Sequence, residues 1–140
     1  MDKLMIDTGV KEYDCGGSEP LRANFSDPNM YATVMEMTDK IVEIENEVNE
    51  KAKGVTDSNG VLQMLKEADE KMKALLNETF GNGNDFDKIL GGVSLMAVAS
   101  NGERVVTNFV AAITPLVQCG ISAFADDAVA QAKAKRSARK

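Results

Sequence analysis

The stretch FSDPNMYATVMEMTDKIVEIENEV, residues 25–48, decides the fold, because it combines a helix start signal with a long apolar stripe. Asp27 is a good N-cap, since its carboxylate can accept hydrogen bonds from first-turn amides, and Pro28 suits the first helical position. Apolar residues then recur in steps of three and four, as they do on one face of a helix. The stretch predicts a helix that runs to about Lys53. The stripe consists of Met30, Val34, Met37, Ile41, Ile44 and Val48.

A second helix is predicted after the loop at residues 56–60, and it ends near Phe80 and Gly81. Its apolar residues again follow helical spacing: Val61, Leu62, Leu65, Ala68, Met72, Leu75 and Leu76. Two helices with so short a connection form an antiparallel αα-hairpin, here over residues 27–80. We expect part of the first stripe to pack on this second helix.

The N-terminal region, residues 1–26, is predicted to hold a short β-hairpin. Residues 4–6 and 10–15 flank the turn-like Asp7-Thr8-Gly9, and residues 21–25 could add a third strand. The C-terminal region, residues 84–140, reads as helices with a basic tail, interrupted at Pro115 and Gly120. Helical spacing is favoured for residues 93–113, with a β-hairpin as the open alternative. The fold class expected is a single, mainly α domain over residues 1–140.

Charge is distributed unevenly along the chain. The net charge is −6, yet residues 131–140 hold five of the 16 basic residues and none of the 22 acidic ones. The first 130 residues therefore carry a net charge of −11, which argues against binding of nucleic acid by the folded part, because phosphates would be repelled. The basic tail could contact RNA or an acidic partner, or it could be the solvated end of a helix.

Cysteine and signal content indicate a cytoplasmic protein. Cys15 and Cys119 are far apart, and the chain has no His, so no zinc site is expected. The start MDKLMIDTG lacks a basic and apolar signal, and no uninterrupted apolar run reaches about 18 residues. We expect free thiols in a reducing compartment and no membrane contact.

Two short motifs invite a chemical interpretation that their surroundings do not support. Asp7-Thr8-Gly9 resembles the active loop of an aspartic protease, but the β framework that such an enzyme needs is missing, so a hairpin turn is predicted. The stretch GNGNDFD, residues 81–87, fails the calcium-loop pattern and is better explained by a helix end followed by an Asx cap. With no catalytic set in view, we predict a protein that is not an enzyme and needs no cofactor or metal.

The order of these parts resembles the small tail assembly chaperones of long-tailed bacteriophages and their prophage relatives. FSDP at residues 25–28 and FGNGND at residues 80–85 carry the resemblance best, followed by a helix near residues 108–110 with a proline just downstream. The positions that match the family pattern are structural: Phe25, Asp27, Phe80 and Gly81.

The resemblance implies a non-enzymatic chaperone that binds the tape-measure protein during tail morphogenesis in the cytoplasm of the bacterial host. It also implies contact with the tail tube protein and a longer, frameshifted form in some members. The stripe Met30–Val48 is the candidate partner-binding surface, and the protein is expected to be a homo-oligomer or a client binder. The alternatives are a self-associating structural or adaptor protein and, less favoured, a small nucleic-acid-associated regulator.

Overall fold

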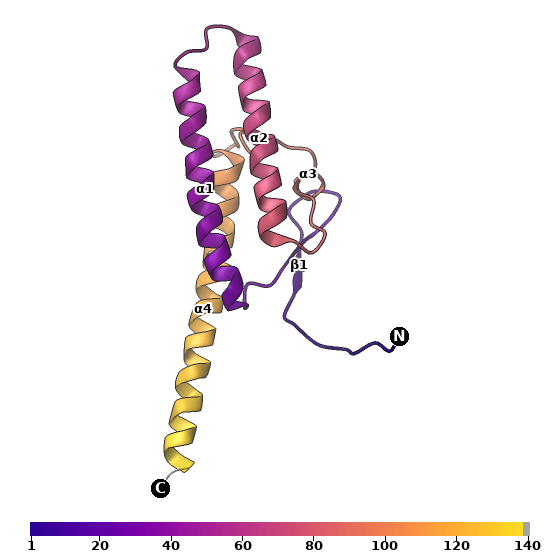
Figure 1. Ribbon diagram of the computed structural model, residues 1–140, viewed down its shortest axis with the longest axis vertical. Coiled ribbons are helices and arrows are strands. Elements are labelled where there is room, and N and C mark those ends of the chain that lie inside the picture. The colour runs from indigo at the N-terminus through magenta and orange to yellow at the C-terminus, as the bar shows by residue number, and fades with distance from the viewer. Residues whose placement is uncertain (139–140) are drawn as a thin grey trace.

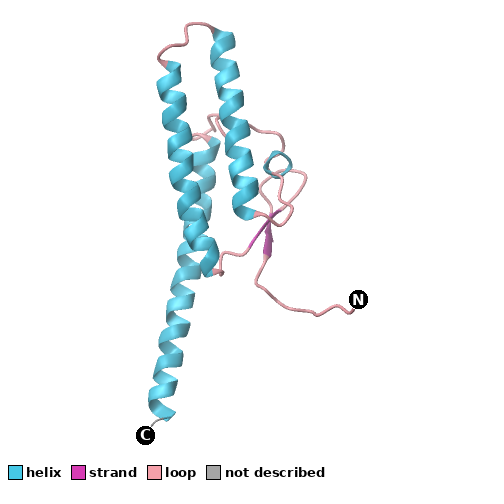
Figure 2. Ribbon diagram, viewed as in Figure 1, coloured by secondary structure: helices cyan, strands magenta, loops and turns pink. Residues whose placement is uncertain are grey.

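The computed structural model describes the backbone of residues 1–138 and the side chains of residues 1–132. Two long helices, α1 (Pro28–Ala52) and α2 (Ser58–Phe80), form an antiparallel hairpin, and α4 (Val105–Ala138) runs beside α1 and continues past its start (Figure 1). A two-stranded sheet and the short helix α3 (Phe86–Ile89) cover the base of α2 (Figure 2). The mainly α fold class and the αα-hairpin are therefore confirmed.

Local capping fixes the ends of both hairpin helices. The Oδ1 atom of Asp27 accepts a hydrogen bond from the Asn29 amide at 2.9 Å, as predicted for the start of α1. Asp57 does the same for α2, where its Oδ1 accepts from the Gly60 amide at 2.9 Å. The second helix ends before Gly81, whose φ of 54° is a backbone conformation that favours glycine.

The N-terminal hairpin is present and lies within two of the predicted strand segments, residues 10–15 and 21–25, but these pair with each other and residues 4–6 take no part. Strand β1 (Lys11–Tyr13) pairs antiparallel with β2 (Leu21–Ala23), while residues 3–6 form no strand. The physical reason is burial, because the side chains of Leu21 and Ala23 enter the core whereas residues 4–6 are exposed. The prediction that residues 7–9 form the hairpin turn is wrong, because residues 14–20 connect the two paired strands. Asp7 makes only a local contact, in which its Oδ1 accepts from the Gly9 amide at 2.9 Å.

Helix α4 is continuous, so the predicted interruptions at Pro115 and Gly120 are wrong. Pro115 is exposed, and water can therefore solvate the carbonyl that loses its helical partner. Gly120 is required by a close approach, because a Cβ there would collide with the backbone carbonyl of Phe25. Over residues 93–113 the favoured helix is present only from Val105 onward. Residues 93–104 form turns with an isolated antiparallel bridge between Val98 and Arg104 in place of a β-hairpin.

An aromatic cluster holds the sheet, the hairpin and α4 together. The ring of Phe80 lies 6.1 Å from Phe25, 5.6 Å from Phe86 and 6.0 Å from Phe109, measured between ring centroids. Tyr13 extends the cluster to β1, with its ring 5.5 Å from that of Phe25. All but the tilted Phe80–Phe86 pair are edge-on contacts, which add to the stabilisation from apolar burial. The sheet, α3 and α4 therefore meet at the end of α2, around Phe80, and we call this region the base.

Candidate functional site

The predicted partner stripe on α1 lies mostly inside the molecule. Four of its six side chains are buried, with exposed fractions between 1% and 8%, and the other two are half-buried against the same core. The stripe faces α2 and α4, including the buried Met72 and Leu76 of α2 as expected. A partner could reach it only if α1 separated from its neighbours. The buried members are Val34, Met37, Ile41 and Val48, and the half-buried ones are Met30 and Ile44.

A groove between α1 and α4 offers an accessible apolar surface. It consists of two adjoining hollows of about 280 and 290 Å³, which share Thr38. Met35 and Val42 border it with 69% and 51% of their surfaces exposed. Both helices supply its lining residues, and we call this surface the α1–α4 groove: Val34, Met35, Thr38, Asp39, Ile41, Val42, Glu45, Val106, Thr107, Val110, Ala111, Thr114, Val117 and Gln118.

The groove was not predicted from the sequence, although the spacing of its α1 residues indicates a second helix face. Met35, Thr38 and Val42 follow the same steps of three and four as the buried stripe, one position further along. They form a second, partly apolar face beside the first, which a search for a single stripe overlooks. Acidic side chains lie at its edge, with Asp39 and Glu45 among the residues that line the two hollows.

In the described part of the chain, α4 beyond Ala123 extends past the start of α1 with no other helix or strand beside it (Figure 1). All residues from 121 to 132 are exposed, including Ile121 at 45% and Phe124 at 57%. By length and composition alone, Val105–Ala132 also qualifies as a candidate membrane span, with a mean hydropathy of 1.5 and 17% of the window buried. Either a protein partner or a membrane could therefore cover the exposed apolar side chains of this segment.

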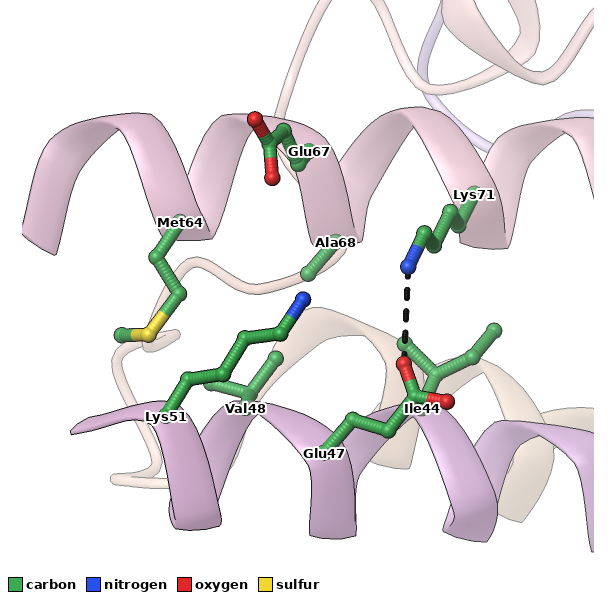
Figure 3. Close-up of a pocket in the computed structure, with 8 residues that line it drawn as sticks. All are labelled: Ile44, Glu47, Val48, Lys51, Met64, Glu67, Ala68 and Lys71. Atoms are coloured by element: carbon green, nitrogen blue, oxygen red, sulfur yellow. Dashed lines mark hydrogen bonds and ion pairs between the residues drawn. The ribbon is translucent and has the colours of Figure 1, made fainter. Parts of the chain in front are cut away.

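A small hollow between α1 and α2 is nearly filled by side chains (Figure 3). Its volume is about 10 Å³, which is at the lower limit for one water molecule. Lys71 on α2 reaches across to Glu47 on α1, with Nζ and Oε2 3.4 Å apart. This hollow is a packing defect of the hairpin and has no room for a ligand.

Within residues 1–132 the buried charged side chain is Lys73, and its role is structural. Its Nζ lies 2.8 Å from Asp87 Oδ1 and 3.1 Å from Asp69 Oδ2. Burial lowers the pKa of Lys73, but the hydrogen bonds to Asp87 and Asp69 outweigh it, so the net pKa is raised. The other oxygen of Asp69 accepts from the Leu95 amide at 2.8 Å. The cluster therefore holds α2, α3 and the following loop together.

The remaining candidates for chemistry have local roles. Burial, followed by the charge of Asp14, raises the pKa of the Cys15 thiol, which makes it a weaker nucleophile. Asp85 caps α3 by accepting from the Asp87 amide at 3.0 Å. Asn84 is buried and pairs with the main chain of Arg22, which explains the motif at residues 81–87 without a cation. Across residues 1–132, no three Cys, Asp or Glu side chains gather as a metal site would require.

The α1–α4 groove and the projecting half of α4 are thus the surfaces on which a functional argument can rest. No protein-family model, curated protein or solved structure matches this chain. We therefore infer the function from the exposed apolar surface, its shape and its charge.

Proposed function

We propose that this protein is a phage tail assembly chaperone that binds helical segments of the tape-measure protein during tail morphogenesis, without enzymatic activity. The observation that supports this most directly is the α1–α4 groove, an exposed apolar trough between two helices. The order of sequence parts that resembles the tail assembly chaperones supplies the identity of the client. On this proposal the protein acts in the cytoplasm of the bacterial host, and the tail tube protein is a further partner.

The groove has the chemistry that an amphipathic helix requires. Helix-in-groove recognition lays the apolar face of a client helix between two helices of the receptor. Met35 and Val42 border the groove and would contact the client first. Methionine is flexible and can adapt to different side chains, which suits a chaperone that must accept several segments of one long client. Asp39 and Glu45 at the rim favour clients with basic residues beside their apolar face.

A peptide-binding experiment tests this proposal. Overlapping labelled peptides that span the tape-measure protein encoded near this protein's gene are titrated with the purified chain, and binding is followed by fluorescence anisotropy. We expect a subset of amphipathic peptides to bind. Met35→Asp and Val42→Asp should each weaken that binding by about tenfold or more, because each places a charge at the edge of the apolar contact.

The matched control is Leu62→Asp. Leu62 lies on α2, outside the groove, and is 65% exposed, so its replacement introduces the same charge without touching the proposed contact. Peptide affinity should then equal that of the wild type. The proposal fails if no peptide binds, or if the groove variants and the control variant lose the same affinity.

A further inference from the structure

A single apolar stripe runs along α4 from the groove into the projecting half. Its members recur in steps of four and three, which is the spacing of a helix-pairing seam. The first three line the α1–α4 groove, whereas the last three stand in the open. The Thr114 hydroxyl already donates to the Val110 carbonyl at 2.7 Å, so it leaves no unsatisfied donor in the seam. We call these residues the α4 stripe: Val110, Thr114, Val117, Ile121, Phe124 and Ala128.

The projecting half has little to stabilise it in a lone monomer. Isolated helices shorter than about 12–15 residues are marginal in water, and most helical stability in proteins comes from packing of an apolar face. Phe124 has 57% of its surface exposed on this helix, so that face is unpaired. A partner that covers it would remove apolar surface from water and order the helix at once.

We propose that a second copy of this chain covers the α4 stripe in an antiparallel pair whose two-fold axis passes near Ile121. The exposed half of each stripe then enters the groove of the other copy, with Phe124 opposite Val117 and Ala128 opposite Thr114. Such a contact is self-complementary, as a two-fold interface requires. The inference does not rest on the proposed client, although a client helix would compete with the second copy for the groove.

Charge complementarity selects the antiparallel orientation. The helical segment beyond Ala132 contains Lys133, Lys135 and Arg136, and no acidic residue. The stretch 35–50 of α1 contains six acidic residues and one basic residue. An antiparallel pair brings the basic end of one copy level with the first half of α4 in the other copy, and that first half lies beside this acidic stretch of α1 (Figure 1). A parallel pair would instead bring two basic ends together and be repelled.

A lipid bilayer fits the same helix less well. Asp126 and Asp127 lie in the middle of the projecting half, and carboxylates are costly inside a membrane. The first half is anchored in the core by Val106, Phe109 and Ile113, which have at most 7% of their surfaces exposed. Transfer of the whole helix into lipid would therefore dismantle the folded domain.

The association state of the full chain tests the pairing. Sedimentation velocity over a wide concentration range should show a reversible monomer–dimer equilibrium that weakens as salt is added. Phe124→Asp should raise the dimer dissociation constant by about tenfold or more. Val129→Asp is the matched control, because Val129 is similarly exposed, at 54%, on the same projecting half but lies off the stripe. It should dimerise like the wild type.

Cysteine cross-linking tests the orientation. In a background with Cys15→Ser and Cys119→Ser, Ile121→Cys should form a disulfide-linked dimer readily, because the two copies of residue 121 meet at the axis. Ala128→Cys should not, since its counterpart lies far away in an antiparallel pair. Equal cross-linking at both positions would indicate a parallel pair and overturn the proposal.

Three further outcomes would also overturn it. The first is a chain that stays monomeric at every concentration. The second is a Phe124→Asp variant that dimerises as well as the Val129→Asp control. The third is flotation of the wild type with vesicles of phosphatidylcholine and phosphatidylglycerol, lost in Phe124→Asp, which would assign the stripe to a membrane.

Discussion

At the scale of single residues, Lys73 is the charged side chain that is buried within residues 1–132. Its Nζ lies 3.1 Å from Asp69 Oδ2 and 2.8 Å from Asp87 Oδ1, and its side chain has only 11% of its surface exposed. The side chain of Asp69 has 16% of its surface exposed, and its second oxygen accepts a hydrogen bond from the Leu95 amide. Removal of the cation would leave two carboxylates close together, one of them largely out of water.

We predict that Lys73→Met lowers the free energy of unfolding by about 2 kcal/mol, because an unpaired buried charge is costly. The value lies below that of a fully buried pair, since Asp87 is 65% exposed and can be solvated. Urea denaturation measures the difference. Lys71→Met is the control: its ion pair with Glu47 is more than half exposed and should matter by less than about 0.5 kcal/mol. Equal losses in the two variants would contradict the structural role given to Lys73.

Residue-scale features were predictable where they are local. Asp27 acts on an amide two positions away, so sequence alone predicts its role as a cap. Asn84 instead pairs with Arg22, which is 62 positions distant, and Asp69 with Leu95, which is 26 positions distant. No periodicity or motif reports such contacts, because they depend on how the elements meet.

At the scale of elements, α4 shows how packing overrides helix-breaking residues. Pro115 lies on an exposed side of the helix, and the nearby Ala111 is also exposed, so the carbonyl that loses its amide partner can bind water. Gly120 lies against the Phe25 carbonyl, where a larger residue would not fit. Sequence propensity predicts a break at both positions. The contacts of α4 with α1 and with the loop that precedes α1 keep the helix continuous.

We therefore predict that Pro115→Ala stabilises the protein by about 1 kcal/mol or more, because it restores a helical hydrogen bond that proline cannot donate. A higher midpoint of thermal unfolding at low protein concentration would show this. Ser122→Ala is the control, since it improves helix propensity on the same exposed helix by only a few tenths of a kcal/mol and adds no hydrogen bond. An unchanged or lower midpoint for Pro115→Ala would mean that the proline fits α4 without cost.

The candidate site was missed at this same scale. The steps of three and four from Met30 to Val48 correctly predict one helix face, but periodicity does not tell whether that face meets the rest of the chain or a partner. The structure places it against α2 and α4. The accessible groove begins one position further along, at Met35 and Val42. It exists only because α4 packs beside this part of α1, and the spacing along α1 does not report that position.

At the scale of the whole molecule, the well-packed base separates two projecting ends (Figure 1). One end is the tip of the α1–α2 hairpin, and the other is the second half of α4. The order of elements along the chain predicts the hairpin and the C-terminal helix. It does not predict the projection, because that follows from where Gly120 and Phe109 dock α4 on the base.

This division predicts unequal local stability along α4, which amide hydrogen exchange can measure. Residues 105–118 pack through Val106, Phe109 and Ile113, so their amides should exchange only on global unfolding. Residues 122–132 are exposed throughout and should open by fraying, so their amides should exchange far faster in dilute solution. Protection of this second segment should rise with protein concentration as the second copy binds, while that of the first stays constant. Equal protection of both segments at the lowest concentration would show that the projecting half is stable by itself.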